Sequence, residues 1–111
     1  MNLINFLNNL FKYDGFVLID SSSKKYVIGK PIKENPIIVK LLDKNLNYKL
    51  LWNPDLYFGE AYMNGSLIIE NGTLSEFLEI ALRNIGRNDI NVYGKILNKI
   101  KGSYRYLTNF N

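Results

Sequence analysis

Apolar residues recur every three or four positions in two stretches, and this spacing predicts a helix in each. In residues 2–12 it gathers the apolar side chains on one face and asparagines on the other. Residues 73–85 have the same spacing, and Thr73 and Glu76 form the Thr-x-x-Glu pattern of a capping box. We expect both helices to pack on the core. For residues 2–12, an amphipathic helix at a bilayer surface is the alternative, although its polar face lacks lysine.

A third helix is expected over residues 89–101, where Asp89 can cap the first turn. Its apolar face comprises Ile90, Tyr93, Ile96, Leu97 and Ile100. Residues 103–111 show no such periodicity. We therefore interpret residues 1–102 as a single domain and residues 103–111 as the start of a linker or tail.

Short runs rich in Val, Ile, Tyr and Phe predict strands between the first two helices. Residues 16–20 and 26–29 are joined by a polar loop and predict a hairpin. Residues 37–42 form a third apolar run, and residues 46–52 begin with alternating apolar and polar positions. We expect these four strands to form an antiparallel meander, with Pro54 ending the last one.

The stretch around Asn64-Gly65 allows two interpretations. Asn-Gly favours a tight turn with positive φ, which would make residues 66–70 a fifth strand. A short helix over residues 60–63 fits the local pattern equally well. The fold class predicted from all these elements is α+β, an antiparallel sheet of four to five strands packed with about three helices.

The amino-acid composition excludes several kinds of functional site. The chain has neither Cys nor His, which excludes disulfides, zinc sites with thiolate or imidazole ligands, cysteine nucleophiles and histidine-dependent triads. Its glycines are too scattered for a phosphate-binding loop. The N-terminus lacks the pattern of a secretory signal, and no apolar run approaches the ~20 residues of a membrane span. We expect a cytoplasmic location.

Charge is distributed unevenly along the chain. Residues 54–82 contain five acidic residues and no basic one, whereas residues 83–105 contain six basic residues against Asp89 alone. A basic surface can bind the phosphates of lipids or nucleic acids, or it can simply be solvated. The residues we expect at a membrane surface are Arg87, Lys95, Lys99, Lys101 and Arg105.

Residues 59–65, Gly-Glu-Ala-Tyr-Met-Asn-Gly, follow an aromatic residue and a proline and precede the leucine-rich helix. This stretch resembles the N-terminal domain of cyclopropane-fatty-acyl-phospholipid synthases, and a looser similarity extends over residues 15–100. In that family a small lipid-binding domain, similar to sterol-carrier proteins, precedes an S-adenosylmethionine-dependent methyltransferase domain. The resemblance implies that this chain binds phospholipid acyl chains and presents them for methylene addition.

The resemblance also implies where the ligand, cofactor and partners lie. Aromatic residues and methionine suit a loosely shaped apolar ligand, and the candidates are Tyr57, Phe58, Tyr62 and Met63. Packing into the core is the alternative for these four. The cofactor, S-adenosylmethionine, and the catalytic residues belong to the methyltransferase domain, so this chain alone is expected to hold no cofactor and catalyse nothing.

The expected partners are a phospholipid membrane surface at the inner membrane face, the methyltransferase domain of the same or a partner chain, and a second copy in a homodimer. One alternative function is a structural or dimerisation module without lipid binding. Another is a small basic nucleic-acid-binding protein, suggested by the pI of about 9.3 and eight tyrosines. The sequence lacks an aromatic pair within a basic strand, which argues against RNA binding.

Overall fold

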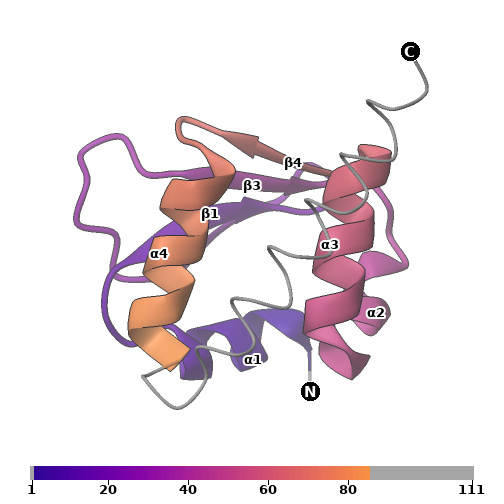
Figure 1. Ribbon diagram of the computed structural model, residues 1–111, viewed down its shortest axis with the longest axis horizontal. Coiled ribbons are helices and arrows are strands. Elements are labelled where there is room, and N and C mark those ends of the chain that lie inside the picture. The colour runs from indigo at the N-terminus through magenta and orange to yellow at the C-terminus, as the bar shows by residue number, and fades with distance from the viewer. Residues whose placement is uncertain (1, 86–111) are drawn as a thin grey trace.

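The structure is a computed structural model that describes residues 2–85 (Figure 1). These residues form an α+β fold in which helices cover one face of a four-stranded sheet (Figure 1). The elements in chain order are α1 (Leu3–Leu10), β1 (Gly15–Ile19), β2 (Lys25–Gly29), β3 (Ile38–Leu41), α2 (Leu46–Trp52), α3 (Pro54–Asn64), β4 (Leu67–Glu70) and α4 (Leu74–Ile85). The predicted α+β class is confirmed. The predicted helix over 89–101 and the domain boundary at residue 102 lie outside the described residues.

The sheet is mixed, so the prediction of an antiparallel meander is wrong. Its strand order is β2-β1-β3-β4. The hairpin of β1 and β2 is confirmed, with Val17 opposite Val27, but β3 runs parallel to β1, with Val39 beside Leu18. The physical reason is burial. Residues 15–18 of β1 are all buried, so this strand is paired on both edges, whereas β2 is largely exposed and forms the sheet edge.

Residues 46–52 form helix α2, so the predicted strand is wrong here. Leu46 and Leu50 are buried one helical turn apart, and Tyr48, which a strand would place on their side, is 76% exposed. Leu46 and Leu50 fall on one face both in a strand, which repeats every two residues, and in a helix, which repeats every 3.6. A stretch of seven residues is therefore too short to distinguish the two structures from its apolar pattern. Pro54 then starts α3 as its first residue, a position that needs no backbone N–H donor, and does not end a strand.

The region around Asn64-Gly65 contains both a helix and a strand. Helix α3 continues through residues 60–63 to Asn64, and β4 then pairs antiparallel with β3. Gly65 has φ 84°, so the predicted positive φ is confirmed, but it caps a helix and does not form a two-residue hairpin turn. The Asn64 side chain accepts a hydrogen bond from the Ser66 N–H at 2.9 Å.

The helices at both ends of the described chain are confirmed, and each has an N-terminal cap. In α1, the Asn2 side chain accepts from the Asn5 N–H at 3.0 Å. In α4, the predicted capping box is formed: Thr73 Oγ1 accepts from the Glu76 N–H at 3.1 Å, and Glu76 Oε1 accepts from the Thr73 N–H at 2.9 Å. These caps fix where α1 and α4 begin over the sheet.

Candidate apolar binding site

Four phenylalanines from different elements meet above the covered face of the sheet. Phe16 of β1 lies edge-on to both Phe11 and Phe77, with ring centroids 5.0 Å apart in each pair. Phe77 of α4 also stacks on Phe58 of α3 at 5.4 Å. Aromatic pairs at these distances contribute about 0.5–1.5 kcal/mol beyond their buried area. The cluster therefore joins α3, α4 and the sheet.

Beside this cluster, the four helices α1, α2, α3 and α4 and the sheet line an open cavity of about 130 Å³. Every residue that lines it is apolar. The lining comprises Leu3, Phe6, Leu7, Leu10, Phe11, Phe16, Leu18, Val39, Leu41, Leu50, Pro54, Phe58, Leu67, Phe77, Leu78 and Ala81. A site of this composition can bind a hydrocarbon group by burial and van der Waals contact but cannot transfer a proton.

The cavity reaches the surface between α1, α3 and α4. Pro54, at the start of α3, lines the cavity and is exposed. Phe6 and Leu7 on α1 and Ala81 on α4 line it and are half-buried. The floor is buried, because Phe16, Leu18, Val39 and Leu41 project from alternate positions of β1 and β3. An apolar ligand would therefore enter past this rim and stop at the sheet.

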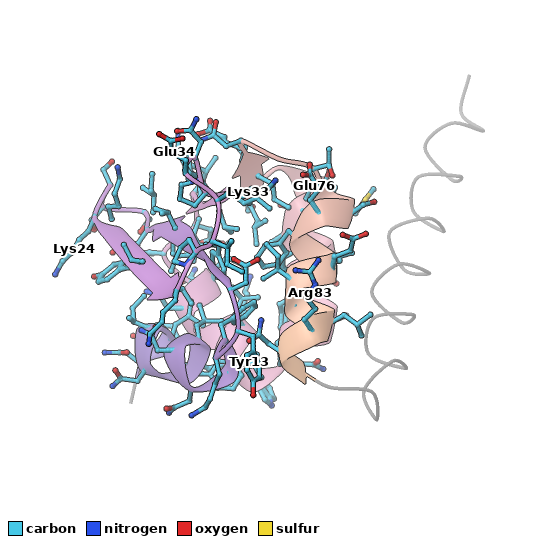
Figure 2. All side chains as sticks on the ribbon, turned by 90° about the vertical axis from the view of Figure 1, so that its left-hand side faces the viewer. Tyr13, Lys24, Lys33, Glu34, Glu76 and Arg83 are labelled. Atoms are coloured by element: carbon cyan, nitrogen blue, oxygen red, sulfur yellow. The ribbon has the colours of Figure 1, made fainter. Side chains whose placement is uncertain are left out.

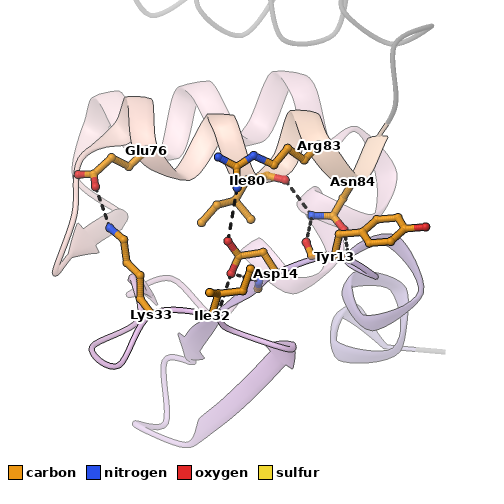
Figure 3. A network of polar contacts seen from close by, with 9 residues as sticks. Tyr13, Asp14, Ile32, Lys33, Glu76, Ile80, Arg83 and Asn84 are labelled. Atoms are coloured by element: carbon orange, nitrogen blue, oxygen red, sulfur yellow. Dashed lines mark hydrogen bonds and ion pairs between the residues drawn. The ribbon is translucent and has the colours of Figure 1, made fainter.

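Polar contacts hold α4 from its other side. Lys33 Nζ lies 2.9 Å from Glu76 Oε2, and Figure 2 shows Glu76 and Arg83 on the side of α4 that faces the loop carrying Lys33. Figure 3 shows two further contacts along this side, from Arg83 to Asp14 and from Asn84 to the backbone of Tyr13. They fix the position of the α4 wall without placing a polar group in the cavity.

The Asn84 amide makes three of these hydrogen bonds. Its Oδ1 accepts from the Tyr13 N–H at 2.6 Å, and its Nδ2 donates to the carbonyl oxygens of Tyr13 at 2.6 Å and Ile80 at 2.8 Å. The Asp14 carboxylate, whose side chain is only 12% exposed, accepts from the N–H groups of Gly15 and Ile32 and lies 3.8 Å from Arg83 Nη1. Both side chains stabilise the loops beside α4.

The carboxyl group of Glu76 has a lowered pKa, and it lies outside the cavity. The hydrogen bond from Lys33 lowers the pKa of the Glu76 carboxyl below its ordinary value, and hydrogen bonds from the Thr73 N–H and hydroxyl act in the same direction. Among residues 2–85, no cluster of acidic side chains could hold a metal ion. No helix in the same part of the chain is long and apolar enough to cross a membrane.

Of the four residues predicted to bind lipid, Phe58 lines the cavity. The ring of Tyr57 lies under Lys49 Nζ, 5.7 Å from the ring centroid, and Tyr62 packs half-buried against the core. Met63 is also half-buried, and it lies outside the cavity lining together with the two tyrosines. Their role in lipid binding stays a prediction. The predicted membrane-surface residues, Arg87, Lys95, Lys99, Lys101 and Arg105, lie outside the described residues.

Most of the cavity wall comes from residues that the sequence does not single out as a site. Leu3, Phe6, Leu7 and Leu10 come from the apolar stripe of residues 2–12, and further lining residues come from that of residues 73–85. The stripes are visible in the sequence, but they predict only that these helices pack on something apolar. That they enclose a space between them depends on how the helices meet.

Comparison of the chain with protein-family models, with curated proteins and with solved structures finds no match. The resemblance to cyclopropane-fatty-acyl-phospholipid synthases, and the similarity to sterol-carrier proteins that it implies, therefore stay predictions based on the residues quoted for them.

Proposed function

We propose that this chain binds the acyl chains of phospholipids and presents them to a methyltransferase domain, without catalysing a reaction itself. The observation that supports the proposal is the cavity of about 130 Å³ lined only by apolar side chains. Concave sites with apolar walls are the usual places where proteins bind small apolar ligands. Without polar groups in the lining, the site selects hydrocarbon and leaves a polar headgroup outside.

The size of the cavity limits what it can hold. An engineered apolar cavity of about 150 Å³ binds benzene, so this cavity accommodates roughly six carbon atoms. That is part of an acyl chain, and the remainder would extend past the rim at Pro54, Phe6 and Leu7. A partly held chain suits presentation, because the region outside the cavity stays accessible to a second domain.

The choice of partner domain rests on the resemblance of residues 59–65. These residues lie in and directly after α3, the helix that contributes Phe58 to the cavity wall. In the resembling family the partner uses S-adenosylmethionine to add a methylene group to a lipid double bond. The cofactor is accordingly assigned to the methyltransferase domain, in the same chain or a partner chain.

Binding can be tested with the full chain and a fluorescent polyene fatty acid below its critical micelle concentration. Ala81→Leu places three more carbon atoms at the cavity rim and should weaken probe binding at least tenfold, since it removes space the ligand needs. Ser75→Leu adds a leucine to an exposed position of α4 outside the cavity lining and should leave binding unchanged.

Two results would count against the proposal. Equal loss of binding in both variants would mean that the probe contacts the surface of α4. No saturable binding by the native chain would favour the structural or dimerisation module.

A further inference from the structure

Helix α2 carries two aromatic side chains that are not packed in the core. Tyr48 is 76% exposed and Trp52 is 84% exposed. They are four residues apart, so they lie next to each other on the face opposite buried Leu46 and Leu50. Figure 1 shows α2 at the margin of the molecule, beside α3. Trp and Tyr are large amphipathic rings, and their placement together in water indicates a surface that contacts something else.

Two lysines lie close in sequence to this pair. The two nearby carboxylates, Asp43 before α2 and Asp20 in the hollow that Tyr48 lines, each accept hydrogen bonds from backbone N–H groups. Lys44 precedes α2 and is exposed, and Lys49 lies on α2 itself, over the ring of Tyr57. Residues 46–52 contain no acidic residue. Trp and Tyr are enriched at the level of lipid headgroups, and lysines near an anionic membrane are attracted to it. Aromatic and basic side chains on one helix therefore match the interfacial layer of an anionic bilayer.

The position of α2 connects this surface to the cavity. A single residue, Asn53, separates Trp52 from Pro54, which forms part of the cavity rim. If Trp52 lies at headgroup depth, Pro54 at the rim lies close to the same layer, because two residues of chain span at most about 7 Å. An acyl chain could then pass from the bilayer into the cavity with little exposure to water.

We infer that the outward face of α2, formed by Tyr48 and Trp52 and preceded in the chain by the exposed Lys44, docks on the headgroup region of an anionic phospholipid bilayer. The inference builds on the acyl-chain function proposed above, for which it names the source of the ligand. It places the contact with the membrane on helix α2.

Trp52 is the single tryptophan of the chain, so its fluorescence reports on this surface directly. We expect vesicles of phosphatidylglycerol and phosphatidylcholine to shift its emission to shorter wavelength and to protect it from iodide quenching. Lipids brominated near the headgroup should quench it more than lipids brominated at the chain end. An emission shift that depends on protein concentration and not on vesicles would overturn the inference and indicate a second copy on α2.

Matched variants test the surface independently of the fluorophore. Tyr48→Ser should weaken co-sedimentation with these vesicles about tenfold, if half of the ring leaves water on docking. Tyr13→Ser removes another exposed ring, 72% exposed and far from α2 in the sequence, and should change nothing. Lys44→Gln should weaken binding about fivefold at low salt, and the effect should shrink at high salt.

Equal sedimentation of the Tyr48 and Tyr13 variants, with unshifted Trp52 emission, would overturn the inference. The fatty-acid probe separates this failure from that of the cavity proposal. Tyr48→Ser should bind the probe like the native chain, because Tyr48 does not line the cavity. Lost probe binding in Ala81→Leu with unchanged vesicle binding would support both assignments as separate sites.

Discussion

Replacing Gly65 tests the junction between α3 and β4. This residue has φ 84°, and a Cβ atom built on it meets nothing within 4 Å, so a substitution is penalised by backbone conformation alone. Placing an L-residue in the left-handed region costs about 1–2 kcal/mol. We therefore expect Gly65→Ala to lower the free energy of unfolding by about 1 kcal/mol. Gly65→Val should lower it by about 2 kcal/mol, because β-branched residues tolerate positive φ least.

Gly65→Asn is the matched control, since Asn adopts this conformation more readily than Ala or Val. Urea unfolding followed by circular dichroism gives the free energies, and thermal melts should show about 4 °C per kcal/mol in a domain of this size. The expected order of stability is Gly, Asn, Ala, Val. Equal stability of the Gly and Val proteins, or equal losses for Asn and Val, would refute the assignment of a left-handed cap.

Three further substitutions test other parts of the structure. Ala81→Leu should raise the free energy of unfolding by about 1 kcal/mol in urea titrations by filling part of the cavity; a decrease would mean that the space cannot accept a larger side chain. Asn84→Ala should lower it by about 1–2 kcal/mol, because the Tyr13 backbone loses two hydrogen bonds. The lowered pKa of Glu76 stabilises the fold above the ordinary carboxyl pKa of 4.5, and this contribution disappears as the pH falls through the lowered value. The difference in stability between native and Glu76→Gln proteins should therefore be present at pH 7 and should shrink as the pH falls below 4.5.

The sequence predicts correctly those helices and strands whose determining contacts lie between residues close together in the chain. The helices over residues 3–10 and 74–85 follow from their apolar spacing, and the Thr73–Glu76 capping box fixes the start of the second. The hairpin of β1 and β2 is also a contact between neighbours in sequence. In each case the residues that determine the element lie within about fifteen positions of one another.

The features that the sequence did not predict depend on distant residues. The parallel pairing with β3 provides hydrogen-bond partners for the second edge of β1. The residues of β3 alone do not indicate which strand it pairs with or in which direction it runs. Residues 46–52 become helical because Leu46 and Leu50 find buried positions one turn apart. A strand would also have buried them on one face, so tertiary packing decided between the two periods.

The candidate site was equally hard to predict, since a cavity is a property of how helices meet and not of any one of them. Phe58 was named from the sequence because it belongs to an aromatic stretch, whereas Leu7 and Ala81 belong to ordinary apolar stripes. Nothing distinguishes a leucine that fills a core from one that lines a space. The exposure of Tyr48 and Trp52 is hard to predict for a related reason: a strand over residues 46–52 would place both rings on the same side as buried Leu50.

The arrangement of polar contacts around α4 bears on how the cavity can remain unfilled in a stable fold. An unfilled apolar space weakens a core, because its lining atoms lack contacts on one side. Here α4 is held from the opposite side by Asn84 and by the ion pairs of Glu76 and Arg83. Burial of Phe77, Leu78 and Ile80 carries most of the attachment of α4. The Asn84 hydrogen bonds add to it, whereas exposed ion pairs contribute little.

Because the polar contacts of Glu76, Arg83 and Asn84 lie outside the cavity lining, they can hold α4 in the same position whether the cavity is empty or occupied. A ligand then gains its full apolar contact without first ordering a helix, and this lowers the entropic cost of binding. The same separation makes the site selective only for hydrocarbon, since every polar group that positions α4 faces away from it. Selection of a particular phospholipid would have to come from the surface that we propose meets the headgroup, the outward face of α2.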